Sequence, residues 1–162
     1  MTAEIEINGV KALTLFDTGS TTDSVTPEFA FATKAKTFKL EEQVILQLGC
    51  VGSQSKISYG THVPVNIDQF KDEVYFDLVN IDQYDCIIGT PFMNKYGVSL
   101  DFGKRSIKIN GREFPAMTFN EEQTQVDKKK QLRGYRQSRP PPRETAPLQR
   151  RVVPGPLPAT SN

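Results

Sequence analysis

The amino-acid sequence predicts a mainly β domain of modest size. Apolar residues alternate with polar ones in several short runs, an Asn-Gly pair separates the first two runs, and helical periodicity is scarce. The 162 residues suit one compact domain with a tail, because domains usually have about 100 to 150 residues. We therefore expect short, mostly antiparallel strands around a single core.

The first strands are expected near the N-terminus, as a hairpin. Ile5 and Ile7 alternate with glutamates, and Asn8-Gly9 leads into the apolar run from Ala12 to Phe16. Asn-Gly between two such runs is a strong signal for a two-residue turn. Period-two alternation predicts further strands over 44–48, 57–67, 74–78, 99–102 and 106–109.

Helices are expected in two short segments. Thr90-Pro91 is a good cap and first-turn pair, and Gly97 lies where a helix often ends, so a short helix is predicted from Pro91 to Tyr96. A further turn or two of helix is expected between Pro27 and Lys34.

The composition of the chain changes near Asn120. Residues 1–119 hold 11 basic and 15 acidic side chains, whereas residues 120–162 hold 9 and 4. The second segment also carries seven of the 11 prolines and a single aromatic residue. Such a segment buries too little apolar surface to offset its ordering entropy, so residues 1–119 are expected to form the domain and 120–162 a disordered, basic, Pro-rich tail or linker.

Several classes of protein are excluded by simple counts. One histidine, His62, and two cysteines, Cys50 and Cys86, cannot build a multi-histidine or four-cysteine metal site within one chain, so no metal and no cofactor are expected. Two cysteines are also too few for a disulfide framework, and no stretch approaches the roughly 20 apolar residues of a membrane span. We therefore expect an intracellular, cytoplasmic protein without a membrane partner.

A near-continuous apolar strand ends abruptly in Asp17-Thr18-Gly19-Ser20. Such a strand delivers the Asp17 carboxyl group to the rim of the core. Partial burial there raises a carboxyl pKa, while nearby N–H and hydroxyl donors hold the ionised form. The alternative interpretation is an Asx turn that closes a hairpin, which these four residue types all favour.

A second apolar strand, Cys86-Ile87-Ile88-Gly89, also runs into a glycine and then into the expected helix. With the first unit it forms a pseudo-two-fold pattern. The sequence, over roughly Ile5 to Ile109, resembles the retroviral-type aspartic proteases, the retropepsins, and is most similar to those of long-terminal-repeat retrotransposons of the Ty3/gypsy type.

The resemblance implies a small closed β-barrel-like fold with one short helix that functions as a two-fold homodimer. It implies an aspartic endopeptidase in which an Asp-activated water hydrolyses peptide bonds of a retrotransposon polyprotein, inside the cell and within retrotransposon particles. Because the chain has a single Asp-Thr-Gly, each subunit would give one Asp17 to a shared active site. The alternative is a catalytically inactive module that dimerises or binds peptides.

The same resemblance suggests roles for individual residues. Thr18 would hydrogen-bond across the two-fold axis, Gly19 would let the backbone approach the carboxylates, and Ser20 would donate to an Asp17 oxygen. The hairpin from Gln47 to Tyr59 would be a flap over the peptide substrate. Its substrate-binding tip would comprise Cys50, Val51, Gly52 and Ser53, and Ile87, Ile88 and Gly89 would support the core.

Other polar residues are given structural interpretations. His62 is expected to be exposed, because it alternates with apolar neighbours, and Asp101 is expected to serve a hairpin turn. Both cysteines are expected to be free thiols, with a redox role for Cys50 as the alternative. The basic tail residues could contact nucleic-acid phosphates in a salt-dependent manner, and a solvated spacer is the competing interpretation.

Overall fold

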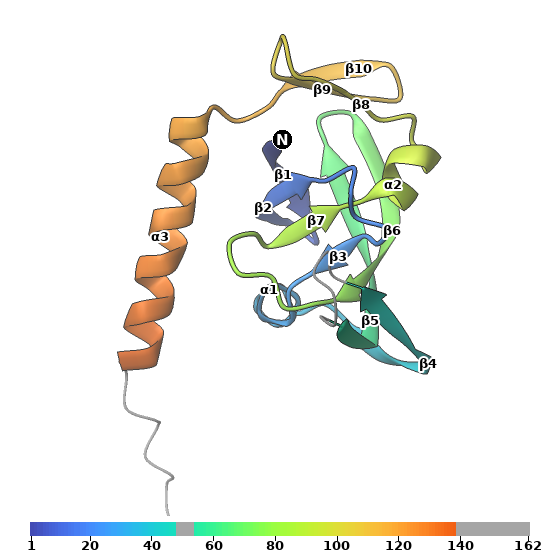
Figure 1. Ribbon diagram of the computed structural model, residues 1–162, viewed down its shortest axis with the longest axis vertical. Coiled ribbons are helices and arrows are strands. Elements are labelled where there is room, and N and C mark those ends of the chain that lie inside the picture. Colours follow the sequence, from blue (N-terminus) through green and yellow to red (C-terminus); the bar gives the residue numbers. More distant parts are fainter. Residues whose placement is uncertain (48–53, 139–162) are drawn as a thin grey trace, which may run out of the picture.

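Most of the chain forms β-strands, as the period-two alternation predicts. The computed structural model describes residues 1–47 and 54–138 (Figure 1). Its strands are β1 (Thr2–Ile7), β2 (Val10–Phe16), β3 (Ser24–Val25), β4 (Thr37–Gln47), β5 (Gln54–Ile67), β6 (Phe70–Leu78), β7 (Cys86–Ile88), β8 (Ser99–Asp101), β9 (Ser106–Ile109) and β10 (Arg112–Pro115). Its helices are α1 (Pro27–Ala32), α2 (Thr90–Lys95) and α3 (Phe119–Ser138).

Six strands close into a small barrel. They follow the order β1-β2-β7-β3-β6-β5, and β1 pairs with β5 to complete the ring, while β4 adds to the outer edge of β5. Two of the pairings, β2 with β7 and β3 with β6, are parallel. The expectation of mostly antiparallel pairing therefore holds for the hairpins but misses these two pairings, which join segments distant in the sequence.

The expected N-terminal hairpin is present. Ile7 pairs with Val10, and the two turn residues, Asn8 and Gly9, have φ angles of 52° and 80°. Two consecutive positive φ angles are the geometry of a type I′ turn, whose twist matches that of the flanking strands. The turn chemistry therefore sets the register that places Asp17 just beyond the end of β2.

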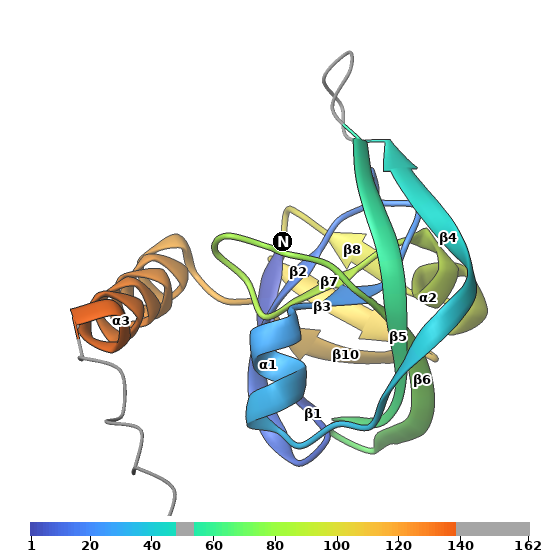
Figure 2. The ribbon, with the colours of Figure 1, turned by 90° about the horizontal axis from the view of Figure 1, so that it is seen from below.

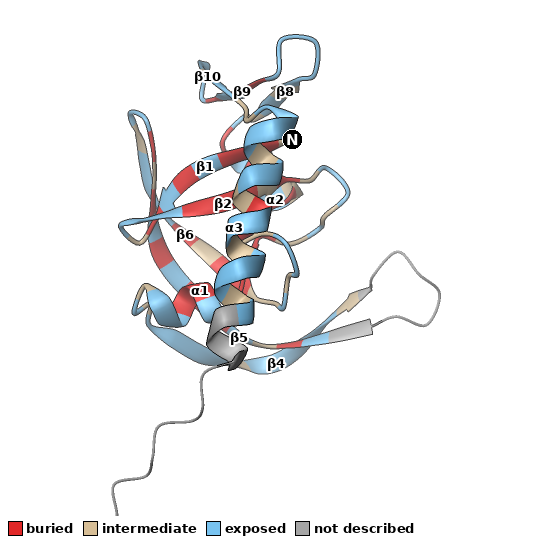
Figure 3. Ribbon diagram, turned by 90° about the vertical axis from the view of Figure 1, so that its left-hand side faces the viewer, coloured by how far each residue is buried: buried red, intermediate tan, exposed pale blue. Residues whose placement is uncertain are grey.

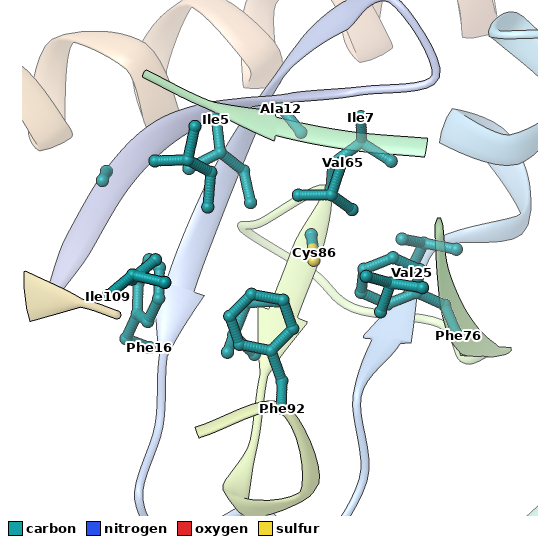
Figure 4. Close-up of a cluster of buried hydrophobic side chains, with 14 of the residues drawn as sticks. Ile5, Ile7, Ala12, Phe16, Val25, Val65, Phe76, Cys86, Phe92 and Ile109 are labelled. Atoms are coloured by element: carbon teal, nitrogen blue, oxygen red, sulfur yellow. The ribbon is translucent and has the colours of Figure 1, made fainter. Parts of the chain in front are cut away.

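The barrel interior is filled by the apolar side chains of the alternating runs (Figure 4). Ile5 and Ile7 of β1, Val65 of β5 and Phe76 of β6 are each at most 2% exposed. Their polar neighbours face outward, as Figure 3 shows for β1. Burial of each such side chain contributes about 1.5 to 3 kcal/mol, so the alternation accounts for the fold of this part of the chain.

The short helices and the last strands match their signals. Thr26 caps α1 by accepting the N–H of Phe29, and α2 has Pro91 in its first turn and ends before Gly97, whose φ is +58°. A three-stranded sheet of β8, β9 and β10 follows, including the hairpin expected over 99–109. Neither β3 nor β10 was expected, because β3 has only two residues and Arg112–Pro115 shows no alternation of apolar and polar residues.

The segment after β10 differs from the expectation of a disordered tail, since residues 119–138 form the helix α3 beside the barrel (Figures 1 and 3). Thr118 and Glu121 form a capping box in which each side chain accepts the other residue's backbone N–H. Acidic residues at the start and basic residues later suit the helix dipole. These local signals outweigh the low apolar content on which the expectation of disorder rested.

Two further expectations concern the flap between β4 and β5 and the tail after α3. β4 and β5 form a long hairpin that projects from the barrel, where the flap was expected (Figure 2). The residues expected at its tip, Cys50, Val51, Gly52 and Ser53, lie outside the described residues, as do residues 139–162 of the expected tail. Over the described ranges no helix is long and apolar enough to cross a bilayer.

Candidate active site

Asp17 lies at the point where β2 leaves the barrel. Phe16 before it is 2% exposed, whereas Asp17 is partly exposed and Thr18 and Gly19 are exposed. The Asp17 Oδ1 atom accepts the backbone N–H of Gly19 at 2.8 Å, and the Asp17 N–H donates to the carbonyl of Ile88 at 2.9 Å. The carboxyl group is thus held by its own loop at the surface of the barrel, as the buried strand before it predicts.

The loop from Asp17 to Thr22 rests on the segment Ile88-Gly89-Thr90. The parallel register of β2 and β7 places Phe16 opposite Ile88, and the Thr90 N–H donates to the Ser20 carbonyl at 2.9 Å. A Cβ atom at Gly89 would lie 2.4 Å from the carbonyl oxygen of Thr22 and 2.7 Å from that of Ser20. Only glycine permits this close approach, which explains why the second apolar strand must end in one.

Ser20 makes a different contact from the one expected. Its hydroxyl group donates to the carbonyl of Thr22 at 2.8 Å rather than to an oxygen of Asp17. The reason is local, since a serine can bond to the backbone two residues ahead without any change in the turn. Ser20 therefore stabilises the shape of the loop, and the Asp17 carboxyl group receives its donor from the Gly19 backbone instead.

One residue of this region was missed by the sequence analysis. Asp23 is 9% exposed, and its Oδ1 atom accepts the Gly89 N–H at 2.7 Å. Burial raises the pKa of this carboxyl group to about 6, although the N–H groups of Gly89 and Phe92 act in the opposite direction. The sequence gives no sign of this burial, because an acidic residue after Ser and Thr residues is typical of an exposed loop.

A cavity of about 290 Å³ opens beside the Asp17 loop. Its walls come from the loop, from β4 and from the segment between β6 and β7. The lining residues are Gly19, Ser20, Thr21, Thr22, Ser24, Leu46, Val79, Asn80, Ile81 and Ile87. The lining combines apolar residues with residues that carry hydroxyl groups.

The remaining candidates lie where the structural interpretations placed them. His62 is exposed and stacks on Phe38, with ring centroids 5.6 Å apart. Asp101 accepts the Lys104 N–H at 2.8 Å within the β8–β9 turn. Cys86 is a free, fully buried thiol, and burial raises its pKa well above the usual range. Within 1–47 and 54–138 no three ligand-type side chains form a group suited to a metal ion.

Comparison with solved structures finds similar chains. The chain is similar to the retroviral protease-like domain of Ddi1 from Leishmania major, with 18% identity, a TM-score of 0.59, and coverage of 75% of this chain and 96% of that one. It is also similar to EIAV protease complexed with the inhibitor HBY-793, with 19% identity, a TM-score of 0.49 and coverage of 63% and 92%. No curated protein matches by sequence.

The family comparison covers the barrel and the Asp17 loop. The family model described as retroviral aspartyl protease matches residues 1–113. Among the described residues, this range includes β1 to β9 and the start of β10, together with the Asp17 loop and Gly89. The expected mainly β, closed-barrel fold of this type is therefore confirmed. The chain belongs to the retroviral aspartyl protease family.

Proposed function

We propose that this protein is an aspartic endopeptidase whose active site forms between two copies of the chain, each contributing Asp17. The observation that carries the proposal is the placement of the Asp17 carboxyl group, which is partly exposed at the barrel rim and held by the Gly19 N–H at 2.8 Å. Thr18 and Gly19 beside it are exposed, so a second copy can approach the loop. Family members of this kind act as homodimers on polypeptides, which supports the two-chain arrangement.

The chemistry requires two carboxyl groups that share one proton. Two carboxylates about 3 Å apart cannot both ionise at low cost, so one stays protonated. The ionised Asp17 takes a proton from a water molecule, and the protonated Asp17 of the other chain donates to the carbonyl oxygen of the peptide bond. The Gly19 N–H donates to Oδ1 of Asp17 at 2.8 Å and so fixes the orientation of the carboxyl group for this step.

The substrate would be an extended segment of polypeptide. The arms of the β4–β5 hairpin offer backbone groups to such a segment, and the cavity beside the Asp17 loop offers room for a side chain. In this proposal the residues Cys50, Val51, Gly52 and Ser53 cover the peptide. Thr18 bonds across the two-fold axis.

A polyprotein of a retrotransposon is the substrate we propose, with residues 1–119 as the protease domain and residues 120–162 as the connection to the next part of the polyprotein. Contacts of α3 favour a spacer over a nucleic-acid tether. Lys129 is paired with Asp85, and Arg133 lies 3.5 Å from Glu28. Two of the cations that would contact phosphates are therefore engaged with the protein itself.

Peptide cleavage measured against protein concentration tests the proposal. Below the dissociation constant of the dimer, the rate should rise with about the square of the concentration, because two chains build one site. Asp17→Asn should abolish cleavage. Asp68→Asn is the matched control, since Asp68 is exposed in the turn between β5 and β6 and asparagine tolerates its φ of 52°. Cleavage that persists in Asp17→Asn would overturn the mechanism, and peptide binding without cleavage by the wild type would favour the inactive module.

A further inference from the structure

Asp23 is a buried carboxyl group that the proposed mechanism does not use. It follows the Asp17 loop and precedes β3, and its Oδ1 atom accepts the Gly89 N–H at 2.7 Å, 66 residues away in the sequence. Its own carbonyl accepts the N–H of Asp77 at 2.9 Å. Asp23 therefore ties the loop to the start of α2 and to β6 at once.

The contact belongs to a seam between the Asp17 loop and the segment Ile88-Gly89-Thr90. Backbone hydrogen bonds join the two sides at Asp17 and at Ser20, at distances of 2.9 Å each. Gly89 lies in the middle, with no room for a Cβ atom between it and the loop. Since the Gly89 N–H is buried against the loop, loss of its acceptor on Asp23 would leave this donor unsatisfied and weaken the seam.

Burial and the charge of Asp77 on β6 disfavour a negative charge on Asp23. Burial also raises the pKa values of the Cys86 thiol on β7 and of the Tyr96 hydroxyl at the end of α2, and Asp23 in turn adds to both increases. Tyr75 donates its hydroxyl group to Asp77 at 2.6 Å, which holds the Asp77 carboxyl group in place. Burial, and then the charge of Asp77, raise the pKa of Asp23 to about 6 against the pull of the Gly89 and Phe92 N–H groups.

Building on the proposed function, we infer that Asp23 is a positioning residue that holds the Asp17 loop against Gly89, and that it does so more firmly when its carboxyl group is protonated. A protonated carboxyl group still accepts the Gly89 N–H on one oxygen, and it buries no charge beside Asp77. The ionised group is stabilised by water, which reaches it when the seam loosens. Order in the Asp17 loop then falls as the pH rises through about 6.

Cleavage measured against pH in three proteins tests this inference. Asp23→Asn keeps an oxygen that accepts the Gly89 N–H but carries no charge, and Asp23→Ala removes the acceptor. Between about pH 5 and about pH 7, the ratio of kcat/KM for Asp23→Asn to kcat/KM for the wild type should rise about fivefold. The reason is that only the wild type has an ionisable side chain at position 23. Asp23→Ala should be slower than Asp23→Asn at both values. Superimposable profiles for the wild type and Asp23→Asn would overturn the inference.

A second measurement separates this inference from the proposed function. The amide NMR signal of Gly89 should titrate with a midpoint near the Asp23 pKa of about 6 in the wild type, and it should stay flat in Asp23→Asn. A flat signal in the wild type would overturn the inference whatever the activity. Absence of cleavage in every protein, together with the titration of Gly89, would overturn the proposed function and leave the pH-dependent link between Asp23 and Gly89 supported.

Discussion

The backbone N–H of Leu13 donates to Oδ2 of Asp85 at 2.9 Å, and the other oxygen of this carboxyl group is paired with Lys129. Leu13 lies in β2 and Lys129 in α3, so a single side chain joins the barrel to the C-terminal helix. Glu122 adds to the contact, because it accepts the hydroxyl groups of Tyr84 at 2.6 Å and of Thr2 at 2.9 Å. α3 is therefore attached to the protease-like barrel by specific contacts from Glu122 to Arg133.

Val126→Asp should detach α3 from the barrel. Val126 is 5% exposed, and an unpaired carboxylate in its place would cost on the order of 2 to 3 kcal/mol. The exposed ion pairs that join α3 to the barrel stabilise the contact by only about 0.5 kcal/mol each, which is less than this cost. Trypsin should then cut within Lys128-Lys129-Lys130 at least about tenfold faster. Leu132→Asp is the matched control, since Leu132 is 61% exposed on the same helix. Equal rates for the two variants would show that Val126 does not hold the helix.

Gly89→Ala should disrupt the Asp17 loop. The new methyl group would lie 2.4 Å from the Thr22 carbonyl oxygen, which is backbone and cannot turn aside. Overpacking of this kind costs about 1 to 3 kcal/mol. We expect the free energy of unfolding, measured with denaturant, to decrease by an amount in the upper part of this range. Peptide cleavage should fall at the same time, because Ser20 and Thr22 are displaced with the loop that carries Asp17.

Gly134→Ala provides the comparison for Gly89→Ala. Gly134 lies in α3, where an added Cβ atom meets nothing within 4 Å, and alanine favours helix over glycine by about 1 kcal/mol. This variant should keep or slightly raise the stability. If Gly89→Ala were as stable and as active as Gly134→Ala, the close approach at Gly89 would have no energetic importance.

The parts of this fold that the sequence predicts are those with local causes. The turn at Asn8-Gly9, the cap of α1 and the delivery of Asp17 to the barrel rim each depend on residues next to one another. The insertion of β7 between β2 and β3 depends instead on the pairing of Phe16 with Ile88, 72 residues apart. Alternation shows that a strand is buried but does not show which strand lies beside it.

The unexpected features of the site have the same origin. Asp23 is buried only because β3 is inserted between β6 and β7, and no neighbour in the sequence reports that environment. α3 is different, because its capping box at Thr118 and Glu121 is a local signal that the charge and proline content of the whole segment obscured. The average composition of residues 120–162 obscures the helix, because all seven prolines of this segment lie after residue 139.

Cys86 should react with thiol reagents only when the protein unfolds. It is 0% exposed at the start of β7, and burial raises the pKa of its thiol well above the usual range, so the reactive thiolate is scarce. The measurement uses the Cys50→Ser variant, in which Cys86 is the one remaining cysteine. Labelling in native buffer should be at least about a hundredfold slower than in denaturant, and comparable rates would contradict the burial.

Asp23 should make the stability of the protein depend on pH in a defined direction. Its pKa in the folded protein, about 6, lies above the usual 3.8, so the folded state binds the proton more tightly than the unfolded state does. The contribution is therefore fully present below about pH 4 and is lost as the pH rises through about 6. Relative to Asp23→Asn, the wild type should lose about 2 kcal/mol in the free energy of unfolding between about pH 4 and about pH 7.5. Asp68→Asn, which removes an exposed charge, should show no such difference, and a constant gap between the wild type and Asp23→Asn would mean that Asp23 titrates as an exposed carboxyl group does.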